Sequence, residues 1–290
     1  MANLKEIRSR IASVKNTQKI TRAMYLVAAA RLRKAQENIL RMRPYAKSTM
    51  DIISRMASSL DGEADLHPLL AKREPQRVML VCLSSDRGLA GGFNAQVTKA
   101  AYKEYNDLIA SGKEVSMIAI GRKASEFFAR RGVTFSHNFS NVYEKLSYEK
   151  ASEIGEVIIS EYTSGQLDAV RIVYNEFKSA IAQNVTVQQI LPIEPQPQDE
   201  AATSVEYIYE PDQQTLLSTL LPLYVHVEVY RALLESVAAE HGARMTAMDN
   251  ATGNAKDMIR SLTLQANRAR QAAITTELTE IVSGAEALNG

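Results

Sequence analysis

The sequence predicts an α/β fold in which the two ends of the chain form a long antiparallel coiled coil that carries a small inserted domain. Apolar residues recur in alternating steps of three and four from Leu4 to Leu60, and again from Leu220 to Ala273. Between these stretches, short apolar runs alternate with amphipathic segments. A 3.5-residue repeat of this length indicates paired helices, whereas the alternation indicates a mostly parallel sheet covered by helices.

The first long helix is predicted over residues 1–62. Its apolar seam, the stripe of residues that follows the 3.5-residue repeat, is interrupted by Gln18, Thr21 and Thr49. At 1.5 Å per residue this helix would be about 85 Å long. Its partner is the last helix, which runs back along it because the two are joined through the insert. Pro44 lies off the seam and should kink the helix, because it removes one backbone hydrogen bond.

The inserted domain is predicted over residues 75–193 as a small Rossmann-like fold. It begins with a continuous apolar run, which is typical of a strand buried on both faces. The expected strands cover residues 77–85, 115–120, 133–137, 169–177 and 185–191, and the expected helices cover residues 94–110, 122–131 and 148–164. Alternating strands and helices of these lengths favour a mostly parallel sheet.

An acidic linker is predicted over residues 194–210, and the last helix over residues 211–290. From Glu194 to Asp212 the chain has six acidic residues and no basic one. Pro222 lies inside the helical pattern that follows. The helix therefore either begins near Pro222 or is bent there.

Composition limits the class of protein. The chain has 290 residues, of which 46% are hydrophobic and 23% charged, with a formal net charge of +1 and one cysteine, Cys82. These values indicate a globular chain without an internal disulfide, as in reducing compartments. Because no apolar run is long enough to span a bilayer and the polar start lacks a signal-peptide core, we expect a protein that is soluble or peripheral to a membrane.

The charge is distributed unevenly along the chain. Residues 1–47 carry twelve basic side chains against two acidic ones, Glu6 and Glu37. A basic helix of this kind is often a solvated face, but it also fits nucleic acid or an acidic protein surface. These three interpretations stay open on composition alone.

The loop over residues 84–94, SSDRGLAGGFN, follows a predicted strand and precedes a predicted helix, which is where phosphate-binding loops lie. Its glycines, Gly88, Gly91 and Gly92, match neither the dinucleotide-binding nor the P-loop spacing. A turn with a structural or docking role is therefore favoured over nucleotide binding. The four histidines are scattered, and we expect no catalytic residue, no cofactor and no metal site.

Three sequence blocks make the chain resemble a known family. They are IRSRIASVKNTQKITRAM with the following VAAARLRKAQ near the start, SSDRGLAGGFN in the insert, and ARMTAMDNATGNAKDMI with NRARQAAITTELTEIVSGAEAL near the end. In this order and over the whole chain they are similar to the gamma subunits of F-type ATP synthases. The resemblance implies a non-catalytic rotor shaft that couples proton flow through a membrane c-ring to ATP synthesis or hydrolysis at the beta subunits.

The resemblance also implies partners and contact residues. The partners would be a hexamer of alternating alpha and beta subunits, an epsilon subunit and the c-ring, with one copy of the chain per complex and no nucleic acid. The complex would hold the chain peripherally at the cytoplasmic face of the bacterial plasma membrane. The residues implied to contact the beta levers and catch loops are Met24, Arg270, Gln271 and Thr275. Those implied to lie at the foot, near the c-ring and epsilon, are Tyr209 and Glu210.

Some residues depart from the family pattern, and two rival classes stay open on the residues alone. The departures are Tyr25, Leu26, Ala90, Pro222 and Ala266. A basic coiled-coil nucleic-acid-binding or scaffold protein would explain the first helix, but stacking aromatics are not apparent near it. A Rossmann-like enzyme would explain the insert, but the glycine fingerprint is missing.

Overall fold

The computed structural model of the chain describes residues 4–58, 67–144, 146–180, 182–195, 210 and 212–289. Internal contacts divide the chain into two compact units. The first, called the coiled-coil unit below, consists of Met1–Ala28 and Met245–Gly290. The second, called the α/β unit, is Ala29–Arg244.

Two long helices contribute to both units, α1 (Leu4–Ser58) and α5 (Gln213–Asn289). Every seam position of α1 from Leu4 to Met56 is buried or half-buried. The same holds for the α5 seam from Leu220 to Ala269, whereas Ala273 is exposed. The 3.5-residue repeat therefore marks the packed stripe of both helices, as a coiled coil requires.

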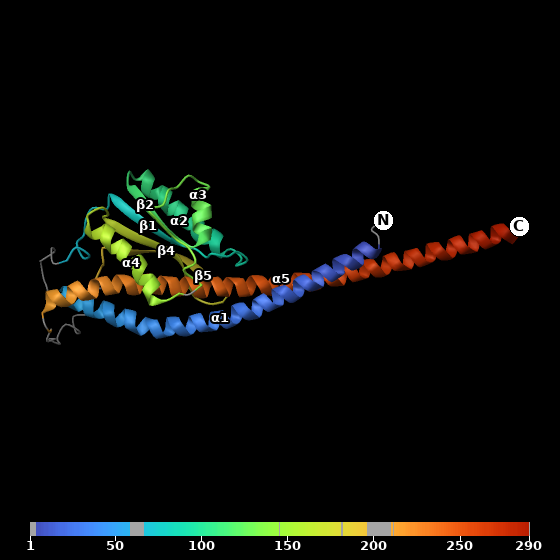
Figure 1. The fold of residues 1–290 in the computed structure, drawn as a ribbon, viewed down its shortest axis with the longest axis horizontal. Coiled ribbons are helices and arrows are strands. Elements are labelled where there is room, and N and C mark those ends of the chain that lie inside the picture. Colours follow the sequence, from blue (N-terminus) through green and yellow to red (C-terminus); the bar gives the residue numbers. More distant parts are fainter. Residues whose placement is uncertain are drawn as a thin grey trace. The chain divides into compact units, whose positions relative to one another are not determined.

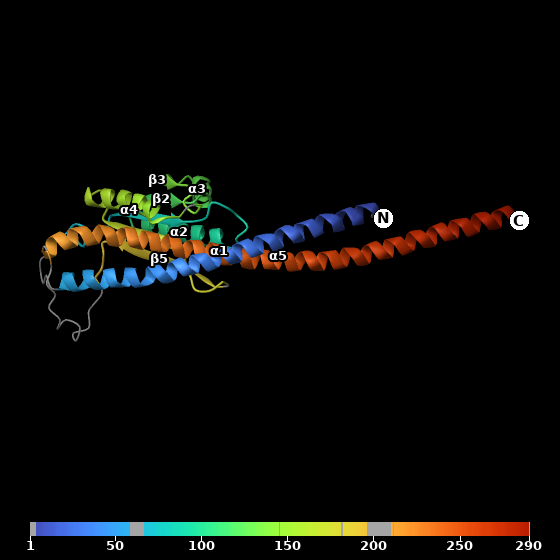
Figure 2. The same cartoon turned by 60° about the horizontal axis from the view of Figure 1, so that its bottom comes forward.

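The two helices pair antiparallel. In the α/β unit, Nε2 of Gln213 at the start of α5 donates to the carbonyl oxygen of Met56 near the end of α1, at 2.8 Å. In the coiled-coil unit, the hydroxyl oxygens of Thr21 and Thr252 lie 2.8 Å apart. Later residues of α5 thus meet earlier residues of α1, which confirms the predicted antiparallel coiled coil. Figure 2 shows α1 and α5 side by side along the α/β unit.

Both internal prolines lie within continuous helices. Pro44 is inside α1 and Pro222 is inside α5. The Asp212 carboxylate accepts a hydrogen bond from the backbone N–H of Thr215 at 2.8 Å, so it caps the N-terminus of α5. Of the two alternatives drawn from the sequence, a helix that begins near Pro222 is therefore wrong. The predicted end of the first helix, near residues 61–62, lies outside the described residues.

The insert is a five-stranded sheet with the strand order β3-β2-β1-β4-β5. The strands are β1 (Arg77–Leu83), β2 (Glu114–Ile120), β3 (His137–Phe139), β4 (Ala169–Phe177) and β5 (Gln183–Leu191). The remaining helices are α2 (Phe93–Ala110), α3 (Arg122–Ala129) and α4 (Tyr148–Thr163). β1 to β4 pair in parallel and β5 pairs antiparallel with β4, so the prediction of a mostly parallel sheet is confirmed.

The third strand is shorter and later than the sequence predicts. It covers His137–Phe139 instead of residues 133–137. The backbone N–H of Val133 donates to Phe128 and completes the turn after α3, and the buried Val133 side chain packs with the core on the α2 and α3 side of the sheet. Val133 is thus apolar because it packs in the core at the turn that ends α3, and not because it belongs to a strand.

Helices cover both faces of the sheet in the α/β unit. α2 and α3 lie on one face, where Val97 and Phe128 pack against Cys82 of β1 (Figure 1). α4 lies on the other face together with α1 and α5. Ile53 of α1 and Val225 of α5 belong to the same apolar core as the strands. The long helices thus form part of the core of the insert.

Candidate functional site

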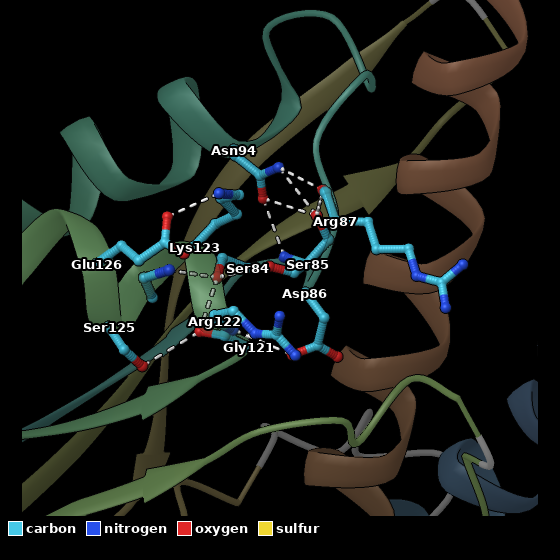
Figure 3. Close-up of polar contacts among 11 residues, drawn as sticks. Ser84, Ser85, Asp86, Arg87, Asn94, Gly121, Arg122, Lys123, Ser125 and Glu126 are labelled. Atoms are coloured by element: carbon cyan, nitrogen blue, oxygen red, sulfur yellow. Dashed lines mark hydrogen bonds and ion pairs between the residues drawn. The ribbon is translucent and has the colours of Figure 1, made fainter.

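The loop over residues 84–94 lies at the carboxyl edge of the sheet, directly after β1. Ser84 Oγ accepts a hydrogen bond from the backbone N–H of Ala124 at 2.7 Å, inside the first turn of α3. Asp86 Oδ1 accepts from the backbone N–H groups of Arg122 and Asn141, both at 3.0 Å. Figure 3 shows the contacts of Ser84 and the contact between Asp86 and Arg122. The loop thus supplies the oxygen atoms that a bound phosphate would otherwise offer to the N-terminus of α3.

The same loop is also bonded internally. Asn94 Oδ1 accepts from the backbone N–H of Ser85 at 2.9 Å, and its Nδ2 donates to the carbonyl oxygen of Arg87 at 3.3 Å (Figure 3). Gly91 has a φ of 55° and Leu89 a φ of 62°, both left-handed. The glycine is suited to this conformation, whereas Leu89 is held in it with its side chain 66% exposed.

Helix α5 makes contacts at the edge of the sheet where a doubly wound domain usually binds its ligand. That position lies at the carboxyl edge where the strand order reverses, here between β1 and β4. Arg244 Nη2 donates to the carbonyl oxygen of Gly88 after β1, at 3.2 Å. Glu235 Oε2 accepts from the backbone N–H of Phe177 at the end of β4, at 3.1 Å. Both contacts come from α5, so the chain's own helix lies against the two strand ends that flank this position.

The charged side chains of α5 that lie at these contacts are paired. Glu240 and Arg244 form an ion pair of 2.6 Å, and both side chains are largely buried. Glu235 also accepts from Arg43 of α1 at 3.4 Å. A buried carboxylate that is satisfied by an arginine and a backbone N–H is held in one position. This geometry fixes α1, α5 and β4 together within the α/β unit.

Groups suited to nucleophilic or metal chemistry do not converge in the part of the chain that the structure describes. Burial raises the pKa of the Cys82 thiol to about 12, so the thiolate is scarce at neutral pH. Among the described residues, no cluster of three histidine, cysteine or carboxylate side chains could hold a metal ion. Burial lowers the pKa of His226, which lies against Gly155 of α4.

His241 lies on the α5 seam within the α/β unit and is nearly buried. Burial, followed by the charges of Arg244 and Arg31, lowers its pKa to about 4. Nδ1 of His241 is buried without a hydrogen-bond partner in the described part of the chain. The imidazole is therefore neutral at physiological pH and acts as a packed side chain.

The residues implied to contact beta subunits lie in two separate places in the coiled-coil unit. Met24 on α1 is half-buried, whereas Arg270, Gln271 and Thr275 on α5 are exposed. Because Thr21 faces Thr252, Met24 lies roughly opposite residue 249, about 30 Å along the helix from Arg270. The structure thus brings Arg270, Gln271 and Thr275 together on one helical segment and does not bring Met24 to them.

The end of α5 forms a single exposed helix. All residues from 270 to 287 are exposed, in line with the end of the packed seam at Ala269. Large apolar side chains on this segment have exposed fractions of 48%, 57%, 67% and 61% for Ile274, Leu278, Ile281 and Val282. A helix of about twenty residues that presents so much apolar surface is marginal in water without a partner.

A second exposed apolar surface lies beside Met24, and the sequence analysis did not single it out. Ile20, Leu26 and Val27 have exposed fractions of 60%, 55% and 52%. In the sequence, this surface is indicated only by apolar residues that lie outside the 3.5-residue seam. Tyr25, one of the departures from the family pattern, is half-buried under the guanidinium of Arg22, which lies 4.8 Å from the ring centre.

The implied foot contacts are only partly described. Glu210 is exposed, whereas Tyr209 lies outside the described residues. In the described part of the chain, no helix is long and apolar enough to cross a membrane.

The fold and these surfaces define a class of protein: a coiled-coil interaction subunit with an inserted doubly wound domain whose switch-point strand ends are contacted by its own helix. The sequence model of the ATP synthase family (ATP-synt) matches residues 3–288. The chain therefore belongs to the ATP synthase family, among its gamma chains, as the curated relatives show.

Those relatives match along their full length. The chain is 49% identical over 290 residues to the ATP synthase gamma chain of Geobacter sp. (strain M21), and 50% identical to that of Geobacter metallireducens. In both comparisons all of this chain and all of the relative are covered. The resemblance drawn from the three sequence blocks is confirmed, and the alternative of a nucleic-acid-binding or scaffold protein is not retained.

Solved structures show the same fold. A chain from the Euglena gracilis mitochondrial ATP synthase (OSCP/F1/c-ring) matches with a TM-score of 0.67 at 17% identity, covering 98% of this chain and 94% of that chain. A chain from the central stalk and c-ring of the Tetrahymena thermophila enzyme matches with a TM-score of 0.61 at 24% identity, covering 80% and 99%. At these identities the likeness concerns the fold alone.

Proposed function

We propose that this chain is the central rotor shaft of an F-type ATP synthase and is itself non-catalytic. It couples proton flow through a membrane c-ring to ATP synthesis or hydrolysis at beta subunits. The observation that carries this proposal is the exposed helical segment over residues 270–287, in a chain that belongs to the gamma chain family. A shaft needs such a segment, because the surrounding subunits must contact a helix that is not already sheathed.

The partners are a hexamer of alternating alpha and beta subunits, an epsilon subunit and the c-ring, with one copy of this chain per complex. In this assembly a collar of alpha and beta subunits buries the apolar side chains between Ile274 and Val282. The exposed guanidinium of Arg270 and the amide of Gln271 have donors free for catch-loop oxygens. Met24, with Ile20 and Val27 beside it, presents an apolar contact to the beta levers.

The basic face of α1 guides the register of these contacts. Its exposed cations are screened by water, and each pairs with an acidic lever loop for only about 0 to 1 kcal/mol. A set of weak and distributed attractions lets the shaft turn past successive beta subunits without stopping at one of them. Tight anchoring by one buried ion pair would oppose rotation.

The foot of the shaft lies near the c-ring and epsilon, where Glu210 and Tyr209 make contacts. The chain is then peripheral to the membrane and held there through the complex, at the cytoplasmic face of the bacterial plasma membrane. The family match and the finding on membrane-spanning helices support a peripheral position.

In this proposal ATP synthesis and hydrolysis take place on the partner subunits. The supporting observation is that Arg244 and Glu235 of α5 contact the chain directly after β1 and at the end of β4, the two strands that flank the ligand position usual for this fold. The purified chain should therefore have no ATPase activity. Turnover that follows the chain through purification and disappears in an Asp86→Asn variant would contradict a non-catalytic role.

Co-purification tests the whole proposal. A tagged chain expressed in its own cells should bring down alpha and beta subunits in a stoichiometry of one chain per hexamer, together with ATPase activity. Arg270→Ala combined with Gln271→Ala should lower ATP-driven proton pumping more than ATP hydrolysis, whereas Thr263→Ala, an exposed matched control on α5, should leave both unchanged. Recovery of the chain without alpha and beta subunits, or with nucleic acid, would refute the assignment.

A further inference from the structure

Helices α2 and α3 cover the face of the sheet opposite α1 and α5 (Figure 1). Four basic side chains are exposed there, Lys99 and Lys103 on α2 and Arg130 and Arg131 directly after α3. We call these four side chains the α2–α3 cation patch. None of the four forms an ion pair with a carboxylate in the part of the chain that the structure describes.

Two carboxylates near the patch form ion pairs with cations that are not part of it. Glu104 on α2 pairs with Arg171 of β4, and Glu126 on α3 pairs with Lys123 at 2.6 Å. Asp107, which is exposed on α2, offsets part of the charge of the patch. The patch therefore keeps a net positive charge, although Asp107 and Glu126 offset part of it.

The positive potential of the patch reaches its surroundings. A hydrogen bond from Lys123 lowers the pKa of Glu126, and the charges of Arg130 and Arg122 add to this effect although desolvation opposes it. In addition, the negative end of the α3 dipole faces Arg130 and Arg131, which favours cations at this place. The arrangement is therefore stable without an internal counterion.

Arg131 is held in a fixed orientation. Its guanidinium carbon lies 3.6 Å from the ring centre of Phe127 and 5.2 Å from that of Tyr102. Nη1 donates to the carbonyl oxygen of Phe127 at 3.0 Å. A stacked and hydrogen-bonded arginine loses less side-chain entropy on binding than a free one, and its remaining N–H groups suit a carboxylate.

We propose that the α2–α3 cation patch docks an acidic, extended segment of a partner protein. Lys99 and Lys103 stand one helical turn apart, or about 6 Å along α2. Alternate residues of an extended chain are about 6.6 Å apart on one side. A segment with a carboxylate at every second residue therefore matches both lysines, while Arg131 takes a further carboxylate with two N–H groups.

The surface favours a protein over nucleic acid or a membrane. The rings of Phe127 and Tyr102 are covered by Arg131, so they do not offer a free face on which a base could stack. Membrane recruitment by charge uses clusters of about 4 to 8 cations next to an apolar anchor. The patch has four cations and none of its own side chains is apolar.

Residue-resolved lysine acylation of the full chain tests the proposal at low ionic strength. The probe is a synthetic peptide of alternating glutamate and serine, with alternating glutamine and serine as the uncharged control peptide. The acidic peptide should slow acylation of Lys99 and Lys103 by about threefold more than that of the exposed α1 lysines Lys15 and Lys34, as one charge-assisted contact would. Arg131→Gln should remove this difference, whereas Arg131→Lys should weaken it and Arg41→Gln should leave it intact.

Three outcomes would overturn the proposal. One is equal protection of α1 and α2 lysines, which would mean nonspecific charge attraction. Another is protection of Lys99 and Lys103 by phosphatidylglycerol vesicles, or by a single-stranded oligonucleotide, at lower concentration than by the acidic peptide. The third is full retention of protection in Arg131→Gln. None of these outcomes depends on assembly with alpha and beta subunits, so the test is separate from that of the rotor function.

Discussion

The hydroxyl oxygens of Thr21 in α1 and Thr252 in α5 lie 2.8 Å apart, and each hydroxyl also has a carbonyl partner in its own helix. Thr252 Oγ1 lies 2.7 Å from the carbonyl oxygen of Met248, and Thr21 Oγ1 lies 3.1 Å from that of Gln18. Since a hydroxyl has one proton, one threonine bonds its own helix and accepts from the other. This polar pair stands on both seams and fixes the register of the coiled-coil unit.

Replacement of both Thr21 and Thr252 by valine should stabilise the coiled-coil unit. Valine keeps the branched shape and converts two polar groups into buried apolar area, for a gain of about 0.5 to 1.5 kcal/mol in the local free energy of opening. Hydrogen exchange of the amides over residues 10–30 measures this gain. Thr276→Val in the exposed end of α5 is the matched control and should change nothing there. Faster exchange in the double variant would contradict the role given to the pair.

The contact between Gly155 and His226 predicts a large effect of one methyl group. A Cβ at Gly155 would lie 2.4 Å from Cδ2 of His226, so Gly155→Ala must push α4 from α5 and should cost about 1 to 3 kcal/mol. Gly253→Ala in α5 is the matched control, because nothing lies within 4 Å of its Cβ, and alanine should stabilise the helix by about 0.5 to 1 kcal/mol. Urea denaturation followed by circular dichroism measures both. Shifts of the same sign in the two variants would be at odds with this packing.

Acid should destabilise the α/β unit through His241. Its pKa falls from 6.5 to about 4 on folding, so between these values the unfolded chain binds more protons than the folded one. The free energy of unfolding must then decrease as the pH falls through this range, by on the order of 3 kcal/mol in total, of which about 2 kcal/mol falls between pH 7 and pH 5. Denaturation at pH 7 and pH 5 should show a smaller difference for His241→Gln than for the natural chain. An identical pH dependence of both chains would exclude this contribution.

Removal of the residues after Thr276 should spare the fold and weaken the complex. Residues 277–287 of the deleted part are exposed and lie beyond the packed seam, so the free energy of unfolding of the remaining chain should stay the same within about 0.5 kcal/mol. In the assembled enzyme the same deletion removes the apolar face that the collar buries, and heat dissociation of the complex should begin at a lower temperature. Loss of the strands' hydrogen-exchange protection in the truncated chain would show that the pairing register is wrong.

Much of the fold follows from two periodicities in the sequence. The 3.5-residue repeat gave the seams of α1 and α5 residue by residue, because one long regular contact leaves little room for local exceptions. The first strand, Arg77–Leu83, was also predictable from its continuous apolar run, since burial on both faces leaves a strong signal. β3 was not, because three residues at a sheet edge carry almost no pattern. The division into segments 1–62, 75–193, 194–210 and 211–290 stays a prediction.

The candidate site depends on contacts that sequence spacing cannot show. The glycine loop could be excluded as a nucleotide fingerprint, but the reason for its polar residues lies in Arg122 and Asn141, which are 36 and 55 residues from Asp86. The contact of Arg244 with the carbonyl oxygen of Gly88 joins residues that are 156 positions apart. The roles of Met24, Arg270, Gln271 and Thr275 stay predictions, because they concern surfaces of partner subunits.

The shared core of the α/β unit sets the order in which the chain can fold. Ile53 near the end of α1 and Val225 of α5 pack in the same apolar core as Val81 of β1, so the sheet lacks one wall until α5 has been made. Between Ser58 and Gln213 a ribosome needs about 10 to 30 s at 5 to 20 residues per second. Until α5 is made, the seam of the basic first helix and one face of the growing sheet have no partner. Both are covered only when the last quarter of the polypeptide, which forms α5, has been synthesised.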